Sequence, residues 1–293
     1  MLKRIALAVL LVALATPALA QEKLKVVATF SILADLVKNV GGERVAVAVL
    51  VGPNGDAHVY QPTPSDAKTL SEAKLVFANG LGFEGWMGRL VQASGTKAPT
   101  VVATKGVKPR KKDESGHSET DPHAWQSVAN ARIYVANIRD GLVAADPAGK
   151  AAYEANASAY LAQLDALDAE VKDAIAKIPA DRRRIITTHD AFGYFAAAYG
   201  MAFIAPQGVS TEAEVSARDV AKIITQIRKQ KIPAVFLENV TDRRLLERIG
   251  AESGARVGGT LYSDALTDGK GEAPTYLDMM RHNVKQLASA LSS

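Results

Sequence analysis

Cysteine is absent from the 293 residues of this chain. Its absence excludes a disulfide framework, a thiolate nucleophile, a thiolate zinc site and a lipid-anchored bacterial N-terminus, because each of these needs the sulfur atom. The sequence also lacks a basic patch with interleaved aromatic residues, so nucleic acid is a poor candidate partner. Any chemistry of this chain is therefore expected to use nitrogen and oxygen.

Long apolar runs are scarce as well. The main one, Ile5–Ala15, follows Lys3 and Arg4 and leads to the small-residue ending Ala18–Ala20. A membrane-crossing helix needs about 20 apolar residues, and this run is too short. The pattern predicts a secretory signal peptide over residues 1–20, with cleavage before Gln21. We expect the mature chain in an exported compartment, most simply a bacterial periplasm, without stable insertion in the membrane.

The rest of the chain has ordinary globular composition, with 48% hydrophobic and 23% charged residues. Its length allows one large or two medium domains. Short apolar strands alternate with helical stretches, which is typical of parallel α/β layers. One set has strands at 24–29, 45–51, 75–78 and 100–104 and helices at 32–40 and 85–93; the other has strands at 184–188, 202–205, 233–237 and 256–261 and helices at 191–199, 212–229 and 274–291. Thr211 and Glu214 have capping-box spacing at the start of helix 212–229.

The segment between the two sets has one apolar stripe. Its members recur at three- and four-residue steps, as in a helix: Tyr153, Ala157, Tyr160, Leu164, Leu167, Val171 and Ile175. The stripe predicts one long helix, with two ordinary helices as the alternative. We expect a signal peptide at 1–20, an N-terminal α/β lobe at 21–145, a linking helix at 146–179 and a C-terminal α/β lobe at 180–293. A helical link is stiffer than a flexible linker and favours small rocking of the lobes.

Three of the five histidines occupy positions typical of ligand-binding residues. His58 and His189 each lie after a predicted strand, and His123 lies at a predicted helix start. Asp264 follows the last predicted strand. Ligands of open α/β sheets collect beyond the carboxyl ends of strands, so these side chains can converge between the lobes.

Three imidazoles and one carboxylate are a ligand set that suits zinc. The spacing alone is weak support, because His58 and His123 are 65 residues apart in the chain. A lone histidine at a helix start is more often a cap or an ordinary polar contact than a metal ligand. The positions alone therefore leave both interpretations open.

Several motifs together resemble a known family. The segments Gly55–Asp66, Asp121–Trp125 and His189–Phe195 are similar to those of the metal-binding proteins of bacterial zinc and manganese ABC importers, the cluster A-I solute-binding proteins of the ZnuA, AztC and TroA type. The resemblance is collinear over essentially the whole mature chain and includes Asn79–Trp86 and Ser263-Asp264.

This resemblance implies His58, His123 and His189 as metal ligands, with Asp264 as the fourth. It also implies a rigid two-lobed monomer whose metal site lies in the interdomain cleft and whose partners are a membrane permease and its cytoplasmic ATPase. A periplasmic zinc donor is a further partner that stays open.

The choice of metal depends on His189. Members that resemble manganese or iron importers tend to have Glu at this position, whereas zinc-associated members have His. An additional imidazole favours zinc over manganese, which prefers oxygen. The expected function is capture of periplasmic zinc and its delivery to an ABC importer. The alternatives are a manganese or iron importer component and a secreted zinc-dependent hydrolase.

Hydrolysis needs an open coordination position and a nearby general base. Four protein ligands fill a tetrahedral site, and the sequence has no His-Glu-x-x-His helix. We therefore expect that the protein is not an enzyme.

Other polar residues give weaker indications. The segment 108–120 contains His117 beside acidic residues. This pattern is consistent with two interpretations, a loop that collects metal ions or an ordinary solvated loop. His282 on the last helix is expected at the surface. Glu238 follows a strand and is a candidate for an outer contact to a ligand or for a helix start. Trp125 and Tyr60 could shield the metal or could belong to the core.

Overall fold

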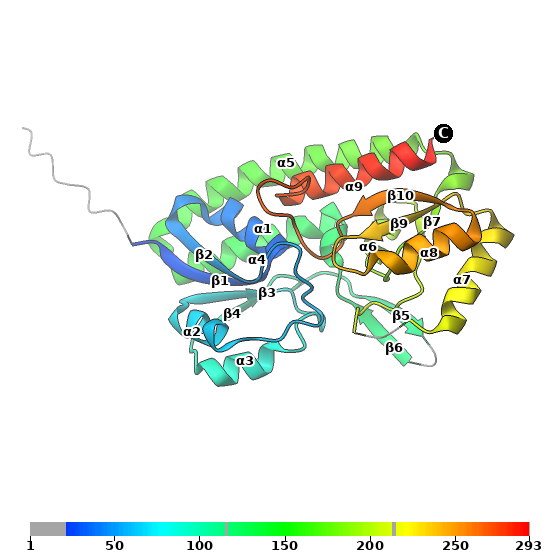
Figure 1. Cartoon of the computed structure of the whole chain (residues 1–293). Helices are drawn as coiled ribbons and strands as arrows, with labels where there is room; N and C mark the ends of the chain where they lie inside the picture. The colour runs from blue at the N-terminus through cyan, green and yellow to red at the C-terminus, as the bar shows by residue number, and fades with distance from the viewer. Residues whose placement is uncertain (1–21, 115–116, 213–214, 293) are drawn as a thin grey trace, which may run out of the picture.

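The computed structural model describes residues 22–114, 117–212 and 215–292, so the predicted signal peptide lies outside the described residues. Two four-stranded parallel sheets form two lobes, which lie side by side beneath a long helix (Figure 1). This arrangement confirms the predicted α/β class and the two lobes. Among the described residues, no helix is both long enough and apolar enough to span a membrane.

The N-terminal lobe contains the sheet with strand order β2-β1-β3-β4. Its central strands are buried on both faces, as parallel strands covered by helices require. Its strands are β1 (Leu24–Phe30), β2 (Val45–Val51), β3 (Leu75–Ala78) and β4 (Thr100–Val102), and its helices are α1 (Ser31–Gly41), α2 (Pro64–Glu72), α3 (Met87–Ser94) and α4 (Val128–Ala145). Short 3-10 helices cover Gly42–Arg44 and Ala124–Gln126. The carboxyl ends of these strands face the other lobe.

The C-terminal lobe contains the sheet with strand order β10-β9-β7-β8. Its strands are β7 (Arg184–Ile186), β8 (Ala202–Ile204), β9 (Ala234–Glu238) and β10 (Arg256–Leu261), and its helices are α6 (Gly193–Tyr199), α7 (Ala217–Gln230), α8 (Arg243–Ser253) and α9 (Tyr276–Leu291). A 3-10 helix covers Ala180–Arg182. The sequence prediction contained no residue range for α2, α4 or α8, although it placed a helix start at His123.

The start of α7 corrects the predicted capping box. The helix begins at Ala217, and the hydroxyl of Ser216 accepts a hydrogen bond from the backbone N–H of Asp219 at 3.2 Å. The sequence predicted a side-chain cap of this kind at Thr211, five residues before Ser216. Thr211 instead donates to Asp56 of the other lobe at 2.6 Å. Glu214, the other predicted member, lies outside the described residues.

One helix links the lobes, as predicted. Helix α5 (Lys150–Ala176) is a single helix of 27 residues, preceded by a 3-10 turn at Pro147–Gly149. The whole predicted apolar stripe is buried. Figure 1 shows α5 along the length of the molecule, with α9 beside it. Residues from both lobes thus pack on one stiff element, which supports limited motion between the lobes.

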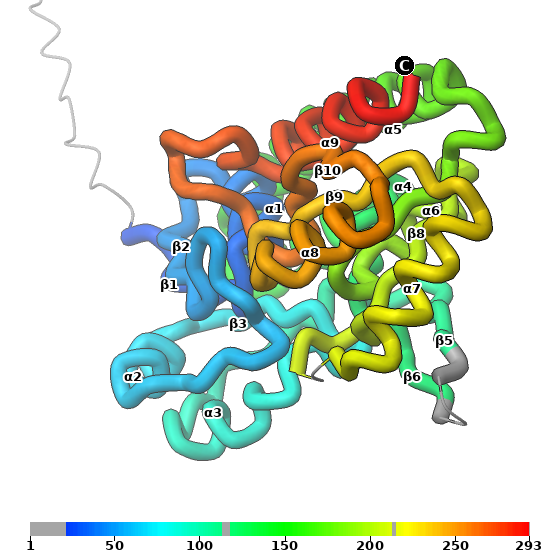
Figure 2. The backbone as a smooth tube through the Cα atoms, turned by 45° about the vertical axis from the view of Figure 1, so that its right-hand side comes forward, coloured from blue at the N-terminus to red at the C-terminus, as the bar shows by residue number. Residues whose placement is uncertain are grey.

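The described parts of the segment 108–120 contain two paired strands, which corrects the expectation of a loop without regular structure; its proposed role in metal collection stays a prediction. Strands β5 (Arg110–Glu114) and β6 (His117–Asp121) pair antiparallel. The hairpin lies beneath the C-terminal lobe in both views (Figure 1 and Figure 2). Lys112 forms an ion pair with Asp190 at 2.5 Å, and the backbone N–H of Arg110 donates to the hydroxyl of Tyr194 at 3.0 Å. These contacts attach β5 to the C-terminal lobe. The side chain of His117 lies outside the described residues.

His282 is buried, which contradicts its predicted surface position. Its side chain is 8% exposed. Its Nε2 donates to the carbonyl of Thr260 at 3.0 Å, and its ring lies edge-on to Tyr262. The neighbouring Arg281 points to solvent and pairs with Glu170. Successive helical residues point about 100° apart, so the exposed charge of one residue does not predict exposure of the next.

Candidate metal centre

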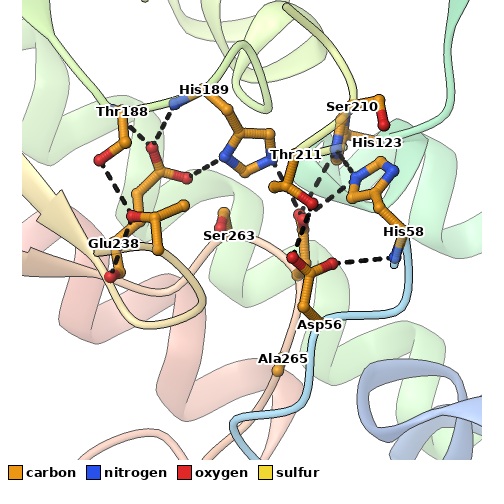
Figure 3. A network of polar contacts seen from close by, with 12 residues as sticks. Asp56, His58, His123, Thr188, His189, Ser210, Thr211, Glu238, Ser263 and Ala265 are labelled. Atoms are coloured by element: carbon orange, nitrogen blue, oxygen red, sulfur yellow. Dashed lines mark hydrogen bonds and ion pairs between the residues drawn. The ribbon is translucent and has the colours of Figure 1, made fainter. Parts of the chain in front are cut away.

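Four side chains from distant parts of the chain meet where the two lobes face each other. His58 follows β2, His123 follows β6, His189 follows β7 and Asp264 follows β10. Each offers one ligand atom, and these atoms all lie within 4.8 Å of one another. The structure therefore brings together the four residues that the sequence singled out, two from each lobe. Figure 3 shows this centre with its surrounding contacts.

The inward-facing atoms are Nε2 of each imidazole and the carboxylate of Asp264. Nε2 of His58 lies 3.2 Å from Nε2 of His123. The oxygens of Asp264 lie 3.3 Å, 3.5 Å and 3.1 Å from Nε2 of His58, His123 and His189. The side chain of His58 is 5% exposed and the other three side chains are fully buried. This compact set can surround one small cation.

The two candidate ligands of the N-terminal lobe, His58 and His123, are held by the same kind of hydrogen bond from backbone to aspartate. Oδ1 of Asp56 accepts the backbone N–H of His58 at 2.9 Å, and Oδ1 of Asp121 accepts the backbone N–H of His123 at 2.9 Å. Aspartate side chains stabilise turns in this way. The Asp-x-His spacing was visible in the sequence, but neither aspartate was recognised as a site residue.

Two imidazoles have a carboxylate behind them. Nδ1 of His123 lies 2.8 Å from Oδ1 of Asp121, and Nδ1 of His189 lies 2.6 Å from Oε2 of Glu238. An acceptor behind a histidine orients the ring and turns the other nitrogen toward a metal. The structure thus places Glu238 in outer contact with a candidate ligand, the first of its two predicted alternatives.

An aromatic wall covers one side of the centre. The ring of Phe83 packs edge-on against His58, with centroids 4.8 Å apart, and contacts Trp125 at 4.9 Å. Trp125 is fully buried and contacts His123 at 5.3 Å, so it both shields the centre and belongs to the core. Tyr60 packs on Trp86 instead. The sequence reading did not identify Phe83.

Direct hydrogen bonds tie the lobes together next to the centre. The indole N–H of Trp125 and the amide of Gln126 both donate to the carbonyl of Ser263, at 2.9 Å and 2.7 Å. The hydroxyl of Tyr276 donates to the carbonyl of Trp125 at 2.7 Å. These bonds join the segment that carries His123 to the segment that carries Asp264, so the two segments are held in fixed register.

Charge and burial shift the pKa values of the four groups in different directions. Burial alone lowers the pKa of His123, but Asp264 and Asp121 outweigh burial and raise this pKa to about 9. Burial also disfavours the charged form of His189, yet nearby carboxylates raise its pKa well above the ordinary value. Burial lowers the pKa of His58. Burial raises and the neighbouring imidazoles lower the pKa of Asp264, and the net result is a pKa well below its usual range.

The donor set fits a divalent cation. Nε2 of His189 and both oxygens of Asp264 have no hydrogen-bond partner among the described residues, although they are buried. Buried polar atoms without partners are costly, and coordination of an ion satisfies them. Three imidazole nitrogens and one carboxylate oxygen can form a closed tetrahedral site, in which no coordination position stays open for water.

Comparison with known proteins identifies relatives along nearly the whole chain. Residues 26–290 match the family model ZnuA, described as zinc-uptake complex component A, periplasmic. The iron-binding protein YfeA of Yersinia pestis is 36% identical over 268 residues, which cover 91% of this chain and 86% of that protein. The manganese-binding lipoprotein MntA of Halalkalibacterium halodurans is 36% identical over 273 residues, which cover 92% of this chain and 89% of that protein.

Solved structures share the fold. The periplasmic zinc-binding protein TroA of Treponema pallidum matches with a TM-score of 0.88 and 33% identity, covering 93% of this chain and all of that chain. A manganese-bound periplasmic metal-binding protein of Candidatus Liberibacter asiaticus matches with a TM-score of 0.82 and 31% identity, covering 92% of this chain. The chain therefore belongs to the ZnuA family, the metal-binding solute-binding proteins of ABC transporters.

Proposed function

We propose that this protein captures zinc in the periplasm and delivers it to an ABC importer. In this proposal His58, His123, His189 and Asp264 are the ligands, and zinc is the cargo. The family match makes a permease and its ATPase the partners. A periplasmic zinc donor upstream, a monomeric state and a cleaved signal peptide at 1–20 are further parts of the proposal.

The observation that carries the proposal is the composition of the buried centre. Three imidazole nitrogens and one carboxylate oxygen face a common point. Nitrogen ligands favour zinc over manganese, whose preferred ligands are oxygens. The family match to a zinc-uptake component supports the same metal.

Carriage of manganese or iron is the second candidate, because two of the relatives are named for these metals. Hydrolysis is not favoured, since the family is a transport component and the four donors form a closed set. The third imidazole, that of His189, favours zinc over manganese or iron. A substitution of His189 therefore tests the metal preference.

The metal preference should change when the third imidazole becomes a carboxylate. In the His189→Glu variant we expect the ratio of zinc affinity to manganese affinity to fall by at least about tenfold, equivalent to about 1.4 kcal/mol of differential binding free energy. The reason is that one nitrogen donor is exchanged for oxygen, the donor that manganese prefers. Competition titrations of both proteins with zinc and manganese measure the ratio. A parent protein that prefers manganese, or an unchanged ratio in the variant, would contradict the proposed cargo.

We further propose how the ion is held and released. An N-terminal lobe at 21–145 and a C-terminal lobe at 180–293 each supply two ligands, and the linking helix at 146–179 restricts their motion. A small rocking movement that breaks one or two bonds then weakens binding. The hydrogen bonds to the carbonyl of Ser263 support a fixed pair of His123 and Asp264. Movement of His58 or His189 is then the simplest route to release.

A further inference from the structure

Glu238 is a buried carboxylate with an unusual position. It is the last residue of β9, and β9 lies between β7 and β10 in the second sheet. Those neighbouring strands lead to His189 and Asp264. Glu238 is 2% exposed, and its only ion-pair contact among the described residues is with His189. A buried carboxylate is costly unless its contacts compensate for lost water, so these contacts show what the residue does.

The two carboxylate oxygens have separate partners (Figure 3). Oε1 accepts the backbone N–H groups of Thr188 and His189, at 2.6 Å and 2.9 Å. Oε2 lies 2.6 Å from Nδ1 of His189 in an ion-pair contact, and neither atom forms a hydrogen bond with the described residues. One oxygen therefore fixes the backbone of the turn after β7, while the other faces the imidazole ring.

The oxygen that faces the ring determines which nitrogen can bind a metal. A neutral imidazole has one N–H and one lone pair, and a carboxylate only accepts hydrogen bonds. Oε2 of Glu238 is the nearer carboxylate oxygen, 2.6 Å from Nδ1, whereas Asp264 lies 3.1 Å from Nε2. A single proton is therefore favoured on Nδ1 of His189, and the lone pair of Nε2 points to the centre.

We propose that Glu238 is a positioning residue that holds His189 in the tautomer with a free Nε2 and thereby matches this position to a nitrogen-preferring ion. Glu238 and His189 act as a pair that contributes to metal selectivity. The inference rests on the proposed function for the identity of the ion, but the preference between tautomers follows from the shorter contact of Glu238, 2.6 Å against 3.1 Å for Asp264.

The pair formed by Asp121 and His123 provides a matched control. Oδ1 of Asp121 accepts from both the backbone N–H and Nδ1 of His123. In Asp121→Asn an amide oxygen can keep both bonds. In Glu238→Gln the two backbone donors hold the amide oxygen at the Oε1 position, so the NH2 group faces Nδ1 and donates to it. That donor favours the tautomer in which Nε2 carries the proton.

We expect Glu238→Gln to raise the dissociation constant for zinc by about 10- to 100-fold, the usual effect of losing an outer partner of a ligand. Asp121→Asn should raise it by less than about tenfold, below the usual range. Competition with a chromophoric chelator measures both constants. Thermal unfolding of the metal-free proteins checks that each variant is folded.

The tautomer itself is directly measurable. Long-range ¹H–¹⁵N spectra of the zinc-loaded parent should show His189 with its proton on Nδ1. In alkaline solution, where the ring of His189 is neutral, the metal-free Glu238→Gln protein should show a larger fraction with the proton on Nε2 than the metal-free parent. A purely structural role for Glu238 would leave the tautomer ratio unchanged.

In a His189→Glu background, we expect the Glu238→Gln substitution to change metal affinity in the opposite direction. In a His189→Glu protein, Glu238 places a second carboxylate against the new ligand, and like charges at short range repel. Adding Glu238→Gln there supplies an N–H donor and should raise the affinity for manganese. A general loss of packing at residue 238 would lower affinity in both backgrounds.

The inference is overturned if Glu238→Gln binds zinc within about threefold of the parent, or if its effect has the same sign in both backgrounds. A parent that prefers manganese to zinc contradicts the proposed cargo and leaves the inference intact, because the tautomer and the sign reversal are measured independently of that preference.

Discussion

Replacing His189 with alanine is expected to lower the affinity for zinc by at least about 100-fold. Loss of a residue that only supports a ligand lowers metal affinity by about 10- to 100-fold, and loss of the ligand itself should cost at least the upper value. The variant removes one of four converging donors and leaves the carboxylate of Asp264 without its nearest imidazole, at 3.1 Å in the parent. His58→Ala and His123→Ala should have similar effects. Isothermal titration with a competing chelator measures each constant.

His282→Gln is the matched control for loss of a buried histidine. His282 is buried and donates to the carbonyl of Thr260, but it is not one of the four converging donors. We expect its zinc affinity to remain within about threefold of the parent. If His189→Ala binds zinc as tightly as the parent while remaining folded, the assignment of the ligands is wrong.

Zinc binding should weaken steeply in acid. In the metal-free protein the pKa of His123 is raised to about 9, so this imidazole carries an extra proton at neutral pH; the pKa of His189 is raised as well. Zinc binds only the deprotonated ring, so binding must release the extra proton of His123. One displaced proton implies that the association constant rises by about tenfold per pH unit while this ring is protonated, and the raised pKa of His189 makes the rise steeper.

Titration calorimetry at pH 7 in buffers of different ionisation enthalpy counts the released protons, and at least about one per zinc is expected. Competition titrations between pH 5.5 and 7.5 measure the slope. A release far below one proton, with a flat pH profile, would show that His123 is not charged before binding.

The raised pKa of His123 also predicts that the stability of the metal-free protein depends on pH. The pKa of His123 in the folded protein, about 9, exceeds the ordinary value of 6.5. Its contribution to stability is therefore complete below pH 6.5 and is lost as the pH rises through about 9. Bound zinc replaces the proton, so the loaded protein should show little of this dependence.

The sequence predicted most of the architecture because the periodic signals are local. The apolar strand Val45–Val51 and the stripe along α5 are visible in the sequence, one as a short apolar run and the other as apolar residues with the period of a helix. Helix α8 was missed because its fully buried positions are few, including Leu246 and Ile249 in an otherwise polar segment. The cap of α7 was misplaced because Thr211 and Ser216 both have an acidic residue three positions later.

The candidate ligands could be predicted because each follows a strand or begins a helix and because the motifs resemble a known family. Their supporting contacts could not. Glu238 is 49 residues from His189, and Phe83 is 25 residues from His58, so these pairs form only when the sheets assemble. The hairpin reads as a polar loop because its partners, Asp190 and Tyr194, belong to the other lobe. The buried position of His282 likewise depends on the packing of α9 against β10.

Anomalous diffraction at the zinc edge, from protein purified out of its native periplasm and analysed for metal content, tests the central claim most directly. We expect one equivalent of zinc, located between the lobes and bound by Nε2 of His58, His123 and His189 and by Asp264. Manganese or iron as the bound metal, or a zinc ion away from these four side chains, would contradict the account.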